Sequence, residues 1–210
     1  MKKTNTWYLL AKLVLFFILN SVNVAIAIVG ISYLQPTFKT GYLIGKTALF
    51  ESTWFPLGLY VHAFTAPIGL LLVSLLVLFR IERFPAVHRL LGKIALVLLL
   101  FAIVPSGWVL SYYAMGGVIG KLIFFLLSSY TAFAAVQGYT AIRQKNTLIH
   151  QHWMREVLAL LASAILLRLL LRLFHVGFDF HGDWAYNSAA LLSWVPSILV
   201  LKVMKTKGFQ

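Results

Sequence analysis

The chain has 210 residues, of which 61% are hydrophobic and 11% are charged, and its 18 Lys and Arg against 5 Asp and Glu give a formal net charge of +13. Soluble domains are typically about 45–50% apolar and about 25% charged, so this composition excludes both a globule folded in water and a disordered chain. The absence of cysteine excludes a disulfide scaffold and a thiolate metal site. We therefore expect a membrane protein.

Six mainly apolar runs are long enough, at roughly 20 residues each, to cross a bilayer as helices. They cover residues of about 8–34, 57–79, 89–113, 118–142, 154–176 and 186–204. The first run passes Ala25-Ile26-Ala27, which resembles the cleavage site of a secretory signal, but apolar sequence continues to Leu34 and favours a retained helix. The predicted fold class is all-α: a polytopic six-helix membrane bundle that forms a single domain over 1–210.

The basic residues divide unequally between the two sides of such a bundle. One side collects most of them: Lys2, Lys3, Lys12, Arg80, Arg83, Arg89, Lys93, Arg143, Lys145, Arg155, Lys202, Lys205 and Lys207. The other side has Lys39, Lys46 and Lys121, and the fifth run contains two arginines. This positive-inside pattern predicts a multi-pass protein of the bacterial inner membrane with both termini cytoplasmic. Since topology accounts for the charge, no nucleic acid partner is expected.

Ionisable residues inside spans are costly, so they are the first candidates for function. The six histidines fall into an inner layer of His88, His150 and His152 and an outer layer of His62, His175 and His181. Small residues share a helix face with two of them: Gly58, Thr65, Ala66 and Gly69 with His62, and Gly92, Ala95, Ala102 and Ser106 with His88. An imidazole beside small residues is what a flat haem needs. Ordinary close helix packing is the alternative.

The fifth run carries Arg168 and Arg172 one turn apart, followed by His175. An arginine within a span costs roughly 2.5–3.5 kcal/mol on the insertion scale, so the pair is expected to have partners. For Arg168 we expect a buried anion, such as haem propionates or a lipid or substrate head group. For Arg172 we expect the side chain to snorkel to the outer interface.

Five short motifs occur in an order that resembles a known family. They are His62 with Gly69, then His88-Arg89-x-Leu91-Gly92, His150-x-x-Trp153-Met154, Arg168, and Trp194-Val195-Pro196. This order is similar to that of the bacterial predicted membrane proteins of unknown function DUF2306, over residues of about 58–202. The chain departs from the family at Glu156, where arginine is usual, at Ser197, where asparagine is usual, and at Lys202, where an acid is common.

The histidine-bearing helices also resemble those of membrane b-type cytochromes, which hold haem between paired histidines on adjacent helices. This resemblance implies an electron-transfer protein with one or two b-type haems. The inner haem iron would be bound by His88 with His150, or with His152 instead, and the outer one by His62 with His175. Arg168 and Arg172 would neutralise the outer propionates, and the basic cluster of Arg89 and Lys93 the inner ones. Beyond the lipid bilayer, the expected partner is a quinone or a redox protein.

Two other functions remain open. The chain could be a haem-free membrane subunit or assembly factor of a larger complex, with its histidines and arginines in structural networks. It could also be a small-solute or anion transporter with Arg168 at the anion site, although no inverted repeat is visible. No Walker loop, dinucleotide fingerprint, nucleophile elbow or zinc-protease helix is present, and the sequence leaves open whether the protein is an enzyme.

Overall fold

In the computed structural model, residues 6–36, 43, 46–79 and 84–206 are described, and they form helices without any strand. The elements are α1 (Thr6–Ser32), the short 3₁₀ helix η2 (Thr47–Glu51), α2 (Trp54–Leu78), α3 (Pro85–Leu98), the π-helical η3 (Leu99–Ile103), α4 (Val104–Tyr112), α5 (Gly117–Arg143), α6 (Thr147–Arg172), the π-helical η4 (Leu173–Gly177) and α7 (Gly182–Thr206). Since η3 joins α3 to α4 and η4 extends α6, six of the resulting helices are long and apolar enough to span a membrane. The predicted six-helix bundle is confirmed.

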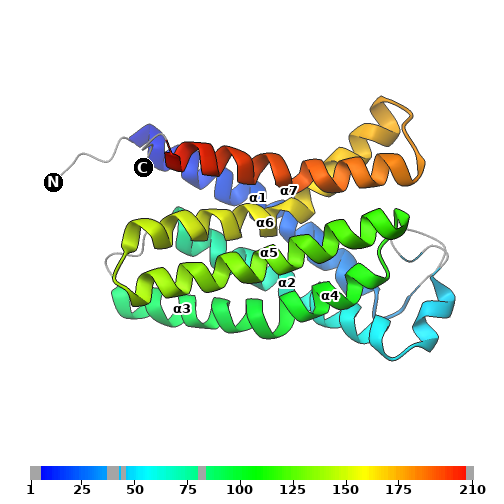
Figure 1. The fold of residues 1–210 in the computed structure, drawn as a ribbon, viewed down its shortest axis with the longest axis horizontal. Helices are drawn as coiled ribbons and strands as arrows, with labels where there is room; N and C mark the ends of the chain where they lie inside the picture. The colour runs from blue at the N-terminus through cyan, green and yellow to red at the C-terminus, as the bar shows by residue number, and fades with distance from the viewer. Residues whose placement is uncertain (1–5, 37–42, 44–45, 80–83, 207–210) are drawn as a thin grey trace.

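The helices run nearly parallel to one long axis, and α1 begins at the end of the bundle where α7 finishes (Figure 1). We call this the terminal end and the other the opposite end. Lys12, Arg89, Arg143 and Lys205 all lie towards the terminal end, near the beginnings or ends of their helices. The basic residues Lys2, Lys3, Lys39, Arg80, Arg83 and Lys207, on which the topology prediction also rests, lie outside the described residues.

Helix α2 packs against α1, α4 and α6, while α5, α6 and α7 form a second packed group. The main core lies between these groups and includes Val73, Leu99, Ala134, Val157 and Ile198. Helix α1 is held on the outside of α2 by polar contacts, because Asn20 Nδ2 donates to Ser74 Oγ at 3.1 Å and Asn23 Nδ2 donates to the Pro67 carbonyl at 2.9 Å. These bonds satisfy amides that would otherwise be costly in lipid.

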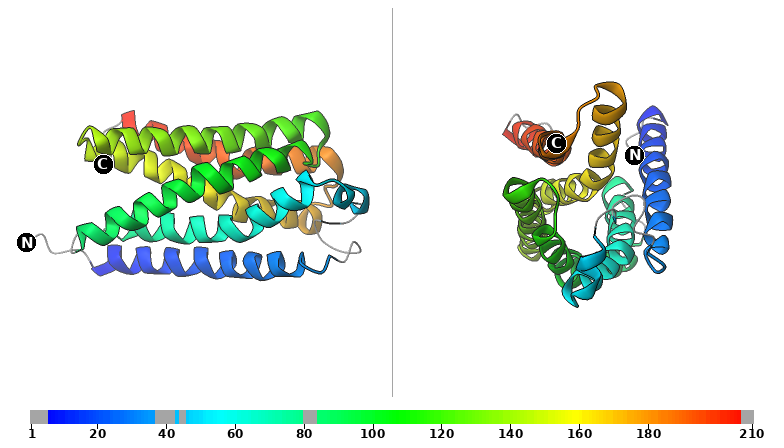
Figure 2. Two further views of the ribbon diagram at one scale, coloured as in Figure 1. Left: turned by 90° about the horizontal axis from the view of Figure 1, so that it is seen from below. Right: turned by 90° about the vertical axis from the view of Figure 1, so that its right-hand side faces the viewer.

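The third span changes its neighbours halfway along. Its first half, α3, packs mainly on α2, whereas α4 packs on both α2 and α5, and in the left view of Figure 2 the span crosses the bundle obliquely. The π-helical turn η3 lies just before Pro105, which lacks the N–H that an α-helix needs at that place. Ser106 Oγ lies 2.6 Å from the Ala102 carbonyl and 3.0 Å from the Ile103 carbonyl, so its hydroxyl donates to the disturbed turn.

Two helices begin earlier than the apolar runs, and this moves three histidines into helical structure. Helix α3 begins at Pro85 rather than 89, because proline is favoured in a first helical turn. Helix α6 begins at Thr147 rather than 154, where the Asn146 side chain accepts a hydrogen bond from the Ile149 N–H at 3.1 Å. His88, His150 and His152 therefore lie on the first turns of rigid helices.

Candidate functional site

At the terminal end the structure brings together two histidines from different helices. His88 lies on α3, His150 lies on α6, and the two are close enough to interact electrostatically. Both side chains are partly buried. This is the pair that the sequence predicted for an inner site.

The hydrogen bond of His150 defines which of its ring nitrogens is free. Nδ1 lies 2.8 Å from the Gly138 carbonyl on α5, and because a carbonyl can only accept, Nδ1 carries the proton. In the neutral ring Nε2 then keeps its lone pair. A histidine that donates from one nitrogen to a backbone carbonyl is oriented to bind a metal through the other.

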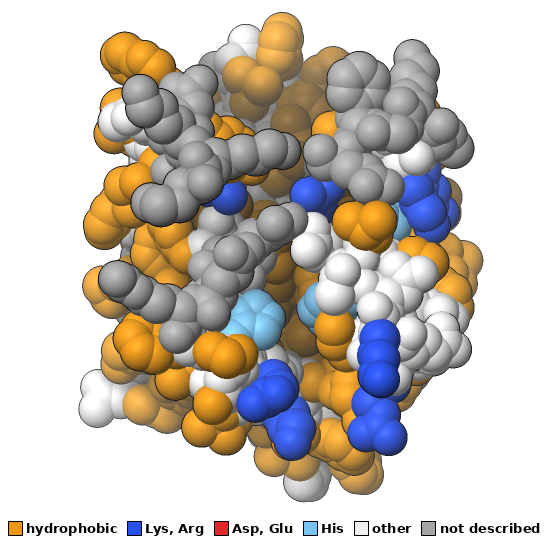
Figure 3. All heavy atoms as spheres, turned by 90° about the vertical axis from the view of Figure 1, so that its left-hand side faces the viewer, with side chains coloured by type: hydrophobic (Ala, Val, Ile, Leu, Met, Phe, Trp, Pro, Cys, Tyr) orange, Lys and Arg blue, Asp and Glu red, His pale blue; other side chains and the backbone are white. Residues whose placement is uncertain are grey.

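The terminal end is hollowed between its helices. Figure 3 shows this end with hydrophobic side chains deep in the hollow and with histidine and basic side chains around it. On α3, one turn beyond His88, a Cβ added to Gly92 would meet nothing within 4 Å. The side of α3 that carries His88 therefore has free space beside it.

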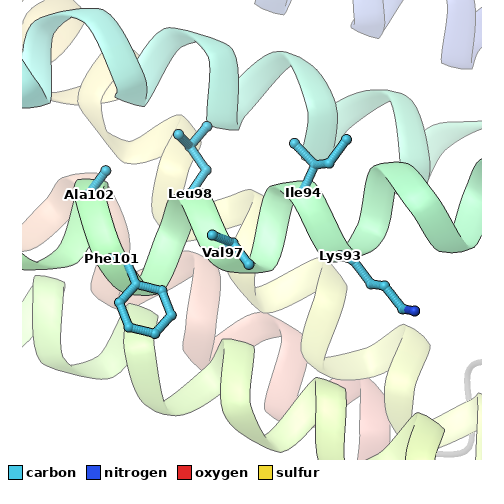
Figure 4. Close-up of a pocket in the computed structure, with 6 residues that line it drawn as sticks. All are labelled: Lys93, Ile94, Val97, Leu98, Phe101 and Ala102. Atoms are coloured by element: carbon cyan, nitrogen blue, oxygen red, sulfur yellow. The ribbon is translucent and has the colours of Figure 1, made fainter.

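An apolar groove of about 420 Å³ runs along α3 and η3 and is lined by Lys93, Ile94, Val97, Leu98, Phe101 and Ala102. In Figure 4 Ile94 and Leu98 point towards α2, while Lys93 and Phe101 point the other way. Phe101 is 78% exposed, as expected for a side chain that faces lipid or a lipid-like molecule. The groove suits an apolar chain with a polar head near Lys93.

Next to the histidine pair lies a buried carboxylate that sequence reasoning missed. Glu156 on α6 is 0% exposed, with Oε1 at 2.8 Å from His152 Nε2 and Oε2 accepting from the Tyr130 hydroxyl of α5 at 2.5 Å. From α7, Lys202 Nζ lies 5.4 Å from the centre of the Tyr130 ring. The available signal was an acid inside a span, one turn after a histidine; the family comparison had marked Glu156 only as a departure.

His152 is therefore occupied differently from His150. Its Nε2 lies 2.8 Å from Glu156 Oε1, so the nitrogen left for another partner is Nδ1, whereas in His150 it is Nε2. His150 is the histidine within electrostatic range of His88, and the choice between the two alternatives that the sequence left for the inner ligand stays a prediction.

On α2, His62 has a protein partner from the third span. Its Nδ1 lies 3.1 Å from Ser106 Oγ, and since the serine hydroxyl donates to carbonyls of its own helix, the imidazole donates to Ser106. Side chains of α4 and η3 occupy the space beside the small residues near His62. A Cβ on Gly58 would lie 2.7 Å from Val109 Cγ1, and one on Gly69 would overlap Ile103. This face of α2 is closely packed against protein and has no free slot for a macrocycle.

His175, the predicted partner of His62, has a partner of its own. It lies in η4, and its ring stacks on that of His181 with centroids 4.9 Å apart. His181 Nε2 in turn lies 2.8 Å from Asp179 Oδ1 on the protein surface. The structure gives His62 and His175 separate partners, and their pairing stays a prediction.

Arg168 lies where three helices meet towards the opposite end. Its Nη1 donates to the Ala164 carbonyl of its own helix at 2.7 Å, and the guanidinium is within electrostatic range of Tyr33 and Tyr186. Burial raises the pKa of Tyr33, which lies just past α1, and the charge of Arg168 opposes that shift. Among the described carboxylates, none forms an ion pair with Arg168 or Arg172, and the anion predicted for Arg168 stays a prediction.

Comparison with known proteins gives one match. The family described as predicted membrane protein (DUF2306) matches residues 59–204. No curated protein and no solved structure matches the chain.

Proposed function

The chain belongs to the DUF2306 family of predicted membrane proteins, and we propose that it binds a b-type haem between His88 and His150 and transfers electrons within the membrane. The observation that carries the proposal is the placement of these two histidines on the first turns of α3 and α6, within electrostatic range of each other, at the end of the bundle that is hollowed (Figure 3). Membrane b-type haems are held by histidines on separate helices, and the axial ligands and burial tune the iron.

The residues of the terminal end fit this cofactor in three respects. His150 is held by the Gly138 carbonyl in the tautomer that leaves Nε2 available. Gly92 leaves free space beside the helix that carries His88. The walls of the hollow are apolar (Figure 3), as a haem ring requires.

The packing around His62 argues against a second haem at the opposite end. His62 donates to Ser106, and the side chains of Val109 and Ile103 occupy the space beside the small residues near His62. We therefore propose one haem, at the terminal end. When bound, its iron would supply the one-electron chemistry.

Residues of the chain would neutralise the haem carboxylates and bind the redox partner. Arg89 follows His88, and Lys93 lies one turn further along α3, so both can neutralise carboxylates at the terminal surface. The groove beside Lys93 offers apolar walls for a lipophilic partner such as a quinone. By the positive-inside rule the terminal end faces the cytoplasm, which would place the haem near the cytoplasmic surface of a bacterial inner membrane.

The test is a reduced-minus-oxidised absorption spectrum of the protein purified after haem-replete expression. A b-type band is expected, and H88A and H150A should each abolish or strongly shift it. H181A is the matched control, because His181 is an exposed histidine at the opposite end, and it should leave the band unchanged. A colourless wild-type protein, or a band that survives both terminal-end substitutions, overturns the proposal.

Two further variants distinguish the ligand sets. H152A tests the alternative inner ligand and should keep the band, because His150 is the histidine within electrostatic range of His88. H62A should also keep it. Loss of the band in H62A alone would instead support an outer haem.

A second candidate function is a haem-free subunit or assembly factor. The close fit of Gly58 against Val109 favours it at the opposite end, where polar and small residues serve helix packing. It would yield a colourless protein that co-purifies with a larger complex from native membranes.

A further inference from the structure

The proposed haem site leaves unexplained the pair of arginines on α6, Arg168 and Arg172. The sequence suggested that Arg168 lies deep in a span, because it stands well before the end of its apolar run. The structure ends this span at Gly177, one residue past the predicted end, and the last turns of α6 with η4 lean away from the other helices at the opposite end (Figure 1).

The neighbours of Arg168 show its level. Tyr33 follows directly on the last residue of α1, and Tyr186 lies one turn after the start of α7 at Gly182. Both are within electrostatic range of the guanidinium. The ends of spans coincide with the headgroup layer, where tyrosines also gather. Arg168 therefore lies close to this layer, and Arg172 is one turn nearer the surface.

Helices α1 and α7, which flank α6, do not bury Arg168. Helix α6 packs on α7 and touches α1, and the right view of Figure 2 shows α6 between these two helices at the opposite end. Arg168 is nevertheless exposed. A long basic side chain that is exposed near the end of a span can reach the lipid headgroups.

Arg168 has more hydrogen-bond donors than the acceptor described for it. A guanidinium has five N–H donors, and one of them is used by the Ala164 carbonyl. Tyr33 and Tyr186 add hydroxyl donors. Both lie within electrostatic range of this permanent cation, and hydroxyl donors beside a cation suit a group with several acceptor oxygens and a negative charge; phosphate also matches the guanidinium fork.

We propose that Arg168, with Tyr33 and Tyr186, binds the phosphate of a phospholipid head group that enters between α1 and α7 in the leaflet at the opposite end. The lipid, rather than free phosphate, is the ligand because Arg168 is exposed near the ends of α1 and α7 and the last turns of α1 present apolar surface: Ile28, Val29 and Ile31 are all more than half exposed. Arg172 adds charge nearer the surface.

The test is native mass spectrometry of the delipidated protein titrated with phosphatidylglycerol. The wild type should retain one lipid more tightly than the others, and R168Q should weaken that site at least tenfold, since a charge-assisted hydrogen bond is lost. K121Q is the matched control: Lys121 lies at the same end, over the Tyr112 ring at 4.7 Å. It should leave retention of the tight lipid unchanged.

Two milder variants keep the test valid if R168Q fails to fold. Y186F and Y33F each remove one hydroxyl and keep the ring, and both should weaken retention by a smaller factor. R168K keeps the charge but loses the planar fork, and it should fall between the wild type and R168Q.

The ligand class is checked with two other probes. Diacylglycerol, which has the acyl chains without phosphate, should not be retained. Inorganic phosphate should not displace the lipid at comparable concentration. Equal retention of diacylglycerol, full displacement by inorganic phosphate, or unchanged retention in R168Q, Y186F and Y33F would overturn the proposal. None of these readouts depends on haem.

Discussion

The two ends of the bundle use the same kinds of residue in opposite ways. At the terminal end, His88 and Gly92 lie on a helix that packs mainly on one neighbour, and a Cβ at Gly92 would meet open space. At the opposite end, His62 and Gly58 lie against α4, which fills the space beside them. Histidine and glycine on a shared helix face are therefore not a sign of a cofactor slot. Whether space for a cofactor remains depends on how closely the adjacent helix packs.

The largest expected effect comes from the buried carboxylate of the terminal end. Replacing Glu156 with alanine removes the acceptor for both Tyr130 and His152, and breaking a buried polar network of this kind costs about 3–5 kcal/mol. E156A should therefore strongly lower the midpoint of thermal unfolding in detergent. D183N, at an exposed acid of the opposite end, is the control and should behave as the wild type. Equal midpoints for E156A and the wild type would show that the network adds nothing to stability.

Glycine substitutions test the comparison of the two ends directly. G58A places a methyl group 2.7 Å from Val109 Cγ1, and overpacking of this kind costs about 1–3 kcal/mol. G92A meets nothing and should stabilise by about 0.5–1 kcal/mol, because alanine is the better helix residue. Thermal unfolding of the two variants side by side measures the difference, and the same sign for both would contradict the contrast.

A larger residue at Gly92 turns the same position into a test of the hollow. G92F should fold, since no atom of the protein lies within 4 Å of the added Cβ. It should prevent haem uptake if the ring occupies that space. An unchanged b-type band in G92F would mean that the cofactor lies elsewhere.

The smallest effect is expected at Lys46, which is 7% exposed in the loop region after α1. Burial lowers the pKa of Lys46 to about 8. Because the pKa in the folded state is below the unfolded value, the folded state carries a penalty that is complete below about pH 8 and disappears above about pH 10. K46M should thus raise the free energy of unfolding near neutral pH by about 0.5 kcal/mol once solvent screening is allowed for, and the gain should vanish in alkaline buffer. A gain that does not depend on pH would exclude this origin.

The sequence was sufficient to predict the spans, because twenty apolar residues in a row have few other uses. It placed the starts of α3 and α6 too late, because a proline in the first turn of α3 and the Asn146 cap of α6 extend both helices beyond the apolar runs from which the spans were predicted. The sequence predicted that His88, His150 and His152 gather at one surface, and they lie on the first turns of α3 and α6 at the terminal end; that two of them are haem ligands stays a prediction.

What the sequence could not supply was the filling of space between helices. Whether Gly58 and Gly69 leave a slot depends on Val109 and Ile103, which come from another helix. The neighbours of Arg168, Tyr33 from the end of α1 and Tyr186 from the start of α7, come from other helices, and the sequence alone could not place them there. Glu156 was visible as a rare acid, but only the structure shows Tyr130 reaching it from α5.

The π-helical turn η3 has a consequence for helix phase. A π-turn accommodates one residue more than an α-turn, and each residue in an α-helix advances the direction of the side chain by about 100°. Every side chain of α4 is thus rotated from where an uninterrupted helix would place it. Deleting a single residue within Leu99–Ile103 would turn Ser106 and Gly107 away from α2 and leave His62 without the hydroxyl that it now meets. The partner of a histidine on one helix is in this way fixed by a one-residue expansion in another.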